Sequence, residues 1–214
     1  VLLLLAAMLM LRVRYSHRPP AGEATLRTVF AGVRFAWHNK ILLGAISLDL
    51  FDVLLGGATA LLPMFARDIL DTGPEGLGLL RAAPASGALL MSVLVLRWPL
   101  SRRAGPVLLG AVAVFGAATV VFGLSHDFGL SLVSLAMTGA ADCISVIIRQ
   151  TLVQAETPDE IRGRVSAVNS IFIGASNQLG EFESGAVAAL LGPVGSVVLG
   201  GAGTILVALS WLWL

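Results

Sequence analysis

The fold is decided by residues 105–149, GPVLLGAVAVFGAATVVFGLSHDFGLSLVSLAMTGAADCISVIIR. This stretch contains two apolar runs, 106–124 and 128–148, with only three residues between them. Each run is close to the ~20 residues that an α-helix needs to cross the ~30 Å hydrocarbon core of a membrane. The apolar residues are continuous and do not alternate with polar ones, which disfavours membrane β-strands. The stretch therefore predicts a hairpin of two membrane-spanning helices.

Similar apolar runs fill most of the remaining chain. They cover residues 1–11, 41–66, 76–96, 165–191 and 194–214. The 214 residues are 57% hydrophobic and 13% charged, with a mean hydropathy of +0.89, whereas a soluble domain has about 25% charged residues. We therefore expect an all-α integral membrane protein with six complete spans, preceded by the end of an earlier span at 1–11. Because the chain begins and ends inside apolar runs, we expect it to be part of a longer protein.

Basic residues lie almost entirely on one side of these spans. Twelve of the fourteen Lys and Arg residues fall in alternate connecting segments. They are Arg12, Arg14, Arg18, Arg27, Arg34, Lys40, Arg97, Arg102, Arg103, Arg149, Arg162 and Arg164. Only Arg67 and Arg81 lie toward the other side. Because cytoplasmic loops carry an excess of basic residues, both ends of the six-span unit, 41–214, are predicted to be cytoplasmic.

The segment before the six spans divides into a linker and an amphipathic helix. Residues 12–21 are basic and contain two adjacent prolines. In residues 22–39, apolar side chains recur at helical spacing, while Arg27 and Arg34 share another face. This pattern predicts a helix lying in the membrane interface, and we favour that interpretation over a stretch that binds nucleic acid or a partner.

Several helix starts are marked by proline. Gly-Pro pairs stand at 73–74, 105–106 and 192–193, and proline suits the first helical turn, where its missing N–H costs nothing. At 157–160 the sequence is TPDE, in which Thr157 and Glu160 can form a capping box. We therefore expect one helix to begin at about residue 158 and to continue through the span 165–191.

Six ionisable residues lie inside the predicted spans. They are Asp49, Asp52, Arg81, Asp142, Glu181 and Glu183. A charge at the centre of a membrane helix costs at least ~2.5–3.5 kcal/mol on insertion scales. Such residues usually face the interior of a bundle or an aqueous cavity, so these six are the first candidates for functional residues.

The acidic pair of the first complete span is a candidate proton-binding site. Asp49 and Asp52 are three residues apart and share a helical face. Two carboxylates this close repel each other when both are charged, so one of them can hold a proton near neutral pH. The alternative is that each carboxylate only hydrogen-bonds to a neighbouring helix.

The span 128–148 carries a line of polar residues that continues to its end. Thr138, Asp142, Ser145 and Arg149 follow one another at helical spacing. Asp142 and Arg149 are about 10 Å apart along the helix axis, at 1.5 Å per residue. We therefore do not expect a direct ion pair between them.

The span 165–191 has the most polar face of all. Ser166, Asn169, Ser170, Asn177, Gly180, Glu181 and Ser184 fall within a stripe of about 120°. A stripe of this kind cannot face lipid. It belongs either to an interhelical hydrogen-bond network, worth only ~0.6 kcal/mol per bond, or to the lining of a polar pathway, which the carboxylate favours.

Arg81 and Glu183 lie about two turns from the same side of the membrane. This equal depth predicts an ion pair of Arg81 with Glu183 or with Glu181. The alternative is that Arg81 extends its long side chain to the membrane surface.

Signatures of catalysis and metal binding are absent from the sequence. There is no glycine-rich phosphate loop with a lysine, and His17, His38 and His126 are scattered without metal-ligand spacing. Cys143 is the single cysteine, which excludes a disulfide within these residues. We expect no enzyme activity, no cofactor and no metal.

Three stretches resemble transporters of the major facilitator superfamily, in the branch that is similar to enterobactin exporters. They are RQTLVQAETPDEIRGRVSAVNSIFIGASNQLGEFESG (149–185), ILLGAISLDLFDVLLGGATALLPMFARDIL (41–70) and GPEGLGLLRAAPASGALL (73–90). The resemblance implies that 1–11 end span six, that 12–40 form the central cytoplasmic loop, and that the six complete spans are spans seven to twelve of twelve.

The resemblance also implies an activity. It implies a secondary transporter of the bacterial inner membrane that exports a small molecule, such as a siderophore or a drug, in exchange for protons. Transport would proceed by rocking of this half against an N-terminal half that lies outside the chain. The alternative is a six-span membrane scaffold or assembly module that does not transport.

The resemblance assigns roles to particular residues. It implies a substrate and proton pathway at Asp49, Asp52 and Asp142, in spans seven and ten. It places span eleven against the other half, which weakens a pathway role of Glu181 and Glu183 without removing it, so that Asn177 and Glu181 stay candidates because of the polar stripe. It implies a cytoplasmic gate at Arg162 and Arg164, to which we add Arg102, Arg103 and Arg149. In PLSRRAGP (99–106), Arg103 and Gly105 match the family's cytoplasmic loop motif, but Arg102 replaces its aspartate, so the charge-relay role of that aspartate is not carried here.

Overall fold

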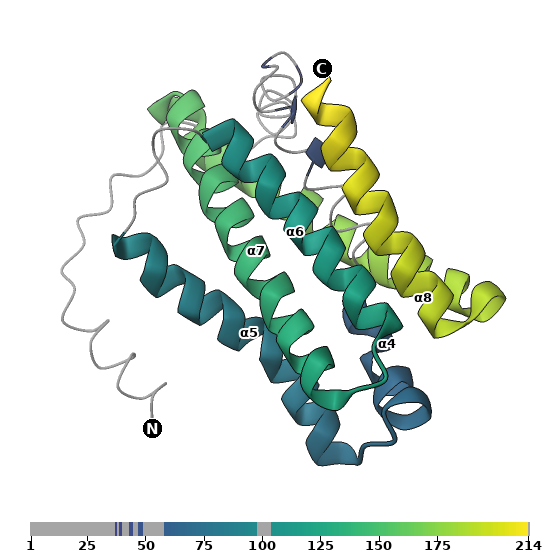
Figure 1. Ribbon diagram of the computed structural model, residues 1–214. Coiled ribbons are helices and arrows are strands. Elements are labelled where there is room, and N and C mark those ends of the chain that lie inside the picture. Colours follow the sequence, from purple (N-terminus) through teal and green to yellow (C-terminus); the bar gives the residue numbers. More distant parts are fainter. Residues whose placement is uncertain are drawn as a thin grey trace, which may run out of the picture.

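The computed structural model describes residues 37, 39, 43–44, 47–48, 58–97 and 104–213. The elements are α4 (Ala58–Met64), η1 (Phe65–Ile69), α5 (Pro74–Arg97), α6 (Ala104–Leu124), α7 (Phe128–Glu156) and α8 (Asp159–Leu212), shown in Figure 1. The described residues form helices and short connections, with no strand among them. Four helices, α5 to α8, are long and apolar enough to cross a membrane. The prediction of an all-α membrane fold is confirmed.

Helix bounds follow the apolar runs on one side of the membrane and exceed them on the other. α5 begins at Pro74, at the Gly-Pro pair, and covers the predicted span 76–96. α7 begins at Phe128 but continues eight residues beyond the predicted 148. Hydropathy marks where a helix leaves hydrocarbon and not where its hydrogen bonding ends, so the polar residues after Arg149 were missed.

Several predicted segments fall outside the described residues. They are 1–11, 12–21, most of the amphipathic helix 22–39 and most of 41–57. α4 and η1 together form the last part of the predicted span 41–66.

α8 contains a break that separates the predicted spans 165–191 and 194–214. Its 54 residues include one residue with a non-helical backbone, Gly192, at φ 77° and ψ 164°. Glycine adopts this positive φ without strain, and Pro193 suits the first turn that follows. The yellow second part of α8 runs back beside α6 in Figure 1. The Ser196 hydroxyl donates to the Ser184 carbonyl oxygen at 2.9 Å, which ties the two parts together.

The capping box predicted at the start of α8 is wrong. The Thr157 hydroxyl donates to the Val153 carbonyl oxygen in the last turn of α7. α8 begins at Asp159, after Pro158, with no side-chain cap. Thr157 therefore closes the helix before it, because two helices meet at this turn and compete for the same hydroxyl.

The core of the described residues has two larger clusters, one toward each side of the membrane, and a small third one of Val153 and Val165. The first lies on the side where α6 meets α7, and it includes Leu62, Phe65, Leu80 and Phe122, all with less than 1% of their surface exposed. The rings of Phe65 and Phe122 stand 4.6 Å apart between centroids. The second cluster lies on the other side, here called the Arg97 side, where α5 ends and α6 begins.

Glycines allow two close helix crossings. A Cβ atom at Gly139 would overlap the backbone of Pro84, and one at Gly87 would overlap the backbone of Ala136. α5 and α7 are therefore in backbone contact, as is common for small residues at membrane helix interfaces. α6 and α8 meet similarly at Gly116 and Gly201, so α7 and α6 form the centre of the bundle (Figure 1).

Candidate functional site

The first candidate site is the polar line on α7. Thr138, Ser145 and Arg149 are buried along one face, with 7%, 1% and 8% of their surface exposed. Asp142 lies among them, and its side chain is 48% exposed. A half-exposed carboxylate beside buried polar groups on a membrane helix is the arrangement expected along an aqueous path.

Arg149 forms an ion pair with Asp142, contrary to the expectation from their spacing. The guanidinium Nη2 lies 3.7 Å from the Asp142 Oδ1. Side chains of a helix tilt toward its N-terminus, so the long Arg149 side chain reaches back over two turns. The prediction of no direct pair was wrong because it measured the rise between backbone positions and left out the length and direction of the arginine.

Ser145 stands between the two charged residues. Its hydroxyl oxygen is buried and, in the described part of the chain, has no hydrogen-bond partner. Buried polar groups are nearly always hydrogen-bonded to protein or to ordered water. The described residues therefore leave the hydrogen-bonding capacity of this buried hydroxyl unused.

The polar stripe of α8 divides into a packed part and an open part. Asn169, Gly180 and Ser184 are buried, whereas the remaining members are exposed. The exposed members are Ser166, Ser170, Asn177 and Glu181. Each interpretation of the stripe therefore applies to a different set of residues. The buried set packs between helices, whereas the exposed set could line a polar pathway.

A third face of α8 is strongly apolar. Ile171, Phe182 and Leu190 are 67%, 76% and 84% exposed. At 100° per residue, Ile171 and Phe182 lie roughly 80–100° around the helix from Glu181. The open polar face with Asn177 and Glu181 is thus distinct from the face that suits lipid.

The predicted ion pair of Arg81 is not formed within the described residues. Arg81 and Glu181 are exposed and Glu183 is half-buried, and no ion pair joins Arg81 to either glutamate in this part of the chain. α5 packs mainly on α7, whereas α8 packs mainly on α6 and also on α4. Equal depth in the membrane did not make these helices neighbours.

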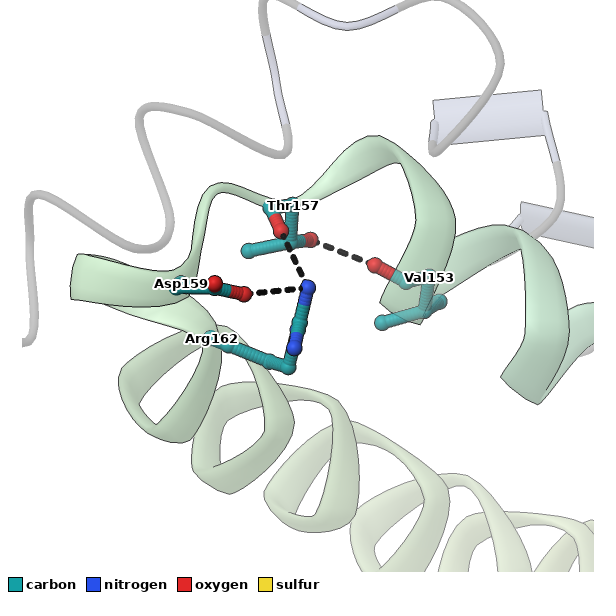
Figure 2. A network of polar contacts seen from close by, with 4 residues as sticks. All are labelled: Val153, Thr157, Asp159 and Arg162. Atoms are coloured by element: carbon teal, nitrogen blue, oxygen red, sulfur yellow. Dashed lines mark hydrogen bonds and ion pairs between the residues drawn. The ribbon is translucent and has the colours of Figure 1, made fainter.

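The second candidate site is the turn between α7 and α8, shown in Figure 2. The Arg162 Nη2 lies 2.6 Å from the Asp159 Oδ1 and donates to the Thr157 carbonyl oxygen at 3.4 Å. The Glu156 Oε2, at the end of α7, also accepts from the Asn39 amide at 3.4 Å. One arginine thus fastens the turn that joins the two helices.

Asp159 is a functional candidate that sequence reasoning missed. Asp159 and Arg162 are three residues apart, a spacing at which helical side chains of opposite charge meet. That signal was present in the sequence, but only the capping box of Thr157 and Glu160 was considered at this helix start. Arg164, the other basic residue of this turn, is half-buried.

Four predicted site residues lie outside the described part of the chain. They are Asp49, Asp52, Arg102 and Arg103. Their proposed roles remain predictions. Among the described residues, no group of three or more His, Cys, Asp or Glu side chains is placed to hold a metal ion, and Cys143 is free and half-buried.

Comparison with known proteins identifies the family. The sequence profile of the Major Facilitator Superfamily matches residues 1–181, and the chain belongs to this superfamily. It is also similar to curated proteins named enterobactin exporter EntS. The protein from Citrobacter koseri is 26% identical over 191 residues, which cover 89% of this chain and 46% of the relative.

Proteins of the same name from two other bacteria match the chain to the same extent. The proteins of the same name from Shigella boydii serotype 18 and Escherichia coli O1:K1 are each 26% identical over 196 residues, covering 91% of this chain and 46% of theirs. The chain therefore spans about half the length of the curated relatives that it matches. No solved structure matches the chain. The family and the apolar helices make this a multi-pass membrane protein.

Proposed function

We propose that this chain is the C-terminal half of a twelve-span exporter that moves a small molecule, such as a siderophore or a drug, in exchange for protons. The family membership supports transport. The name that its relatives share supports export of a siderophore of the enterobactin kind. The basic residues on the Arg97 side support a cytoplasmic location for that side.

The observation that carries proton exchange is the polar line on α7. Asp142 is half-exposed inside a span, its charge partner Arg149 is buried, and no described residue hydrogen-bonds to the Ser145 hydroxyl between them. When Asp142 takes up a proton, its carboxyl group no longer attracts the Arg149 guanidinium by charge, and another anion can take the place of the Asp142 carboxylate. A substrate with acidic groups is such an anion, so proton and substrate would alternate at one arginine.

Two further groups of residues fit this proposal. Asn177 and Glu181 occupy the open polar face of α8, and we assign them to the substrate path, together with Asp49 and Asp52. Arg149, Arg162 and Arg164 lie on the Arg97 side, and we assign them to a cytoplasmic gate with Arg102 and Arg103. The gate and the path would open alternately as this half rocks against the other.

The test uses the full-length transporter reconstituted in liposomes with an imposed pH gradient and with enterobactin as the probe. We expect Asp142→Asn to lose transport driven by the pH gradient while keeping exchange of substrate between equal pools. Asp127→Asn is the matched control, because Asp127 caps α7 outside the span and asparagine caps a helix equally well.

Two outcomes would contradict the proposal. Unchanged coupling in Asp142→Asn would exclude this carboxylate as the proton site. Absence of any transport by the unaltered full-length protein, with every probe of the siderophore and drug classes, would favour the membrane scaffold instead.

A further inference from the structure

An apolar hollow lies over α7, between α5 and α6. Its volume is about 290 Å³. It is lined by Met91 of α5, by Val107, Gly110 and Val114 of α6, and by Met137 and Ile144 of α7, with alanines of α6 and α7 at its floor. Figure 1 shows α7 between the other two helices, which here do not cover it.

The hollow is on the far side of α7 from the candidate path. At 100° per residue, Met137 and Ile144 lie roughly 140–160° around the helix from Asp142. The same side of α7 exposes Leu130, Val133 and Met137 by 47%, 62% and 47%. A membrane helix with a polar face toward a path and an apolar face opposite presents the second to lipid, so the hollow is continuous with the lipid-facing surface.

The hollow lies within one half of the bilayer. Val107 is three residues and Val114 ten residues from the start of α6 at Ala104, which places them about 5 Å and 15 Å from that end. Half of the hydrocarbon core is about 15 Å thick. The hollow therefore extends from the Arg97 side to about the middle of the membrane.

The chemistry of the lining selects an apolar ligand. Sites for drug-sized molecules occupy roughly 300–1,000 Å³ and contain a few polar groups that orient the ligand. Here the lining side chains are all apolar, so a siderophore or another polar compound would lose its hydrogen bonds on entering. Met91 and Met137 are flexible and fit irregular apolar shapes, which suits a hydrocarbon chain.

A positive charge lies at the end of α5, beyond the hollow on the Arg97 side. Arg97 ends α5 and is exposed. It lies six residues beyond Met91, about 9 Å along the helix. Within the described residues Arg97 has no ion-pair partner, so its charge is available to an anionic headgroup.

We propose that this hollow binds one acyl chain of an anionic phospholipid, whose phosphate headgroup lies at Arg97. The lipid would be held on the outer side of the α5–α7 and α6–α7 contacts and would leave the path on the other side of α7 untouched. Binding of this lipid does not depend on the proposed transport function, because it requires only that these helices span a membrane.

The test is native mass spectrometry of the full-length protein, purified in mild detergent and equilibrated with equal amounts of phosphatidylglycerol and phosphatidylethanolamine. A Cβ atom at Gly110 would have no atom within 4 Å, so Gly110→Leu fills the hollow without a backbone clash. We expect it to remove one retained phospholipid. Gly78→Leu is the matched control, since Gly78 is equally open on α5 but outside the hollow.

A second variant tests the headgroup. Arg97→Gln keeps the hollow, and we expect it to lower the preference for phosphatidylglycerol over phosphatidylethanolamine about five-fold, the effect of one basic residue near an anionic membrane surface. Its position at an exposed helix end makes it tolerant of substitution, and a thermal melt of each variant checks folding.

The results that would overturn the proposal are distinct. An unchanged number of retained lipids in Gly110→Leu would exclude the hollow, and an equal loss in Gly78→Leu would place the site elsewhere. A change from dimer to monomer in Gly110→Leu, with lipid retention unaltered, would assign the hollow to a second copy of the chain. An unchanged lipid preference in Arg97→Gln would exclude the headgroup contact.

Discussion

Glycines have opposite surroundings in two regions of this helical bundle. At the crossing of α5 and α7, Gly87 and Gly139 lie directly against the backbone of the neighbouring helix. On the exposed side of α8, Gly163, Gly174 and Gly185 have no atom within 4 Å of an added Cβ. We call the first region the closed crossing, because its glycines are in contact with a neighbouring helix. We call the second the open side of α8, because no described residue packs against its glycines.

The difference shows how one residue type serves two purposes in a membrane protein. Lipid offers little hydrophobic drive for helix association, so close packing of small residues holds helices together. The α5–α7 crossing uses this within the half. The open side of α8, where Gly174 lies near Asn177 and Glu181, leaves the same kind of surface uncovered by the described residues, and we assign it to the proposed path.

The largest effect is expected from filling the closed crossing. Gly139→Ala places a methyl group on the backbone of Pro84. Overpacking typically destabilises a protein by 1–3 kcal/mol, and a clash with rigid backbone should reach about 3 kcal/mol or more. Thermal and denaturant unfolding of the full-length protein measure the loss. Gly185→Ala is the control and should change stability little; an equal loss in both would remove the distinction between the two regions.

A smaller loss is expected at the second crossing, between α6 and α8. A Cβ atom at Gly116 would lie 2.7 Å from the Gly201 carbonyl oxygen and 2.8 Å from the Ile205 side chain. The Ile205 side chain can move, so Gly116→Ala should destabilise the protein by about 1–2 kcal/mol. The same unfolding measurement applies, and a loss larger than that of Gly139→Ala would reverse the order of the two crossings.

An effect on transport rather than on stability is expected from the open side of α8. Gly174→Leu should change the free energy of unfolding by less than about 1 kcal/mol, since it meets no atom of this half. It should nevertheless reduce transport about ten-fold or more, because it enlarges a surface that we assign to the moving path. Liposome transport and a thermal melt are measured on the same sample.

The control for this variant lies one residue further along. Ala175→Leu enlarges a residue that is also exposed but is turned roughly 100° away, toward the apolar face of α8. It should leave both transport and stability unaltered. If Ala175→Leu inhibits transport as strongly as Gly174→Leu, the open polar side has no special role.

The spans could be predicted from sequence, because a length of about 20 apolar residues is a property of the chain alone. The glycine contacts could not. Gly87 and Gly110 are both glycines inside apolar helices. Gly87 lies against the backbone of a neighbouring helix, whereas an added Cβ atom at Gly110 would have no atom within 4 Å, and only the positions of the neighbouring helices make this difference. The break at Gly192 was predictable because the Gly-Pro pair marks a helix start locally.

The candidate site was predictable in its residues but not in its contacts. Asp142 and Arg149 were identified as polar groups in or near a span, yet their ion pair was not expected, since the reach of the arginine was left out. Arg81 and Glu183 were expected to meet on depth alone, but α5 and α8 have other neighbours. Pairing across helices depends on which helices adjoin, and hydropathy does not contain that information.

The smallest effect on stability is expected at the turn between α7, which forms the closed crossing with α5, and α8. Arg162 is paired with Asp159, and their side chains are 45% and 80% exposed, so water and salt screen the pair. A double-mutant cycle of Asp159→Asn and Arg162→Gln should give a coupling free energy of about 0.2–1 kcal/mol, which decreases at high salt. Within the described residues, Arg164 forms no ion pair with Asp159, so Arg164→Gln should show no coupling to Asp159→Asn. A coupling above about 2 kcal/mol would mean that the turn is held as firmly as the α5–α7 crossing. The proposed gate would then have to open elsewhere, because so tight a turn could not change during the proposed rocking of this half.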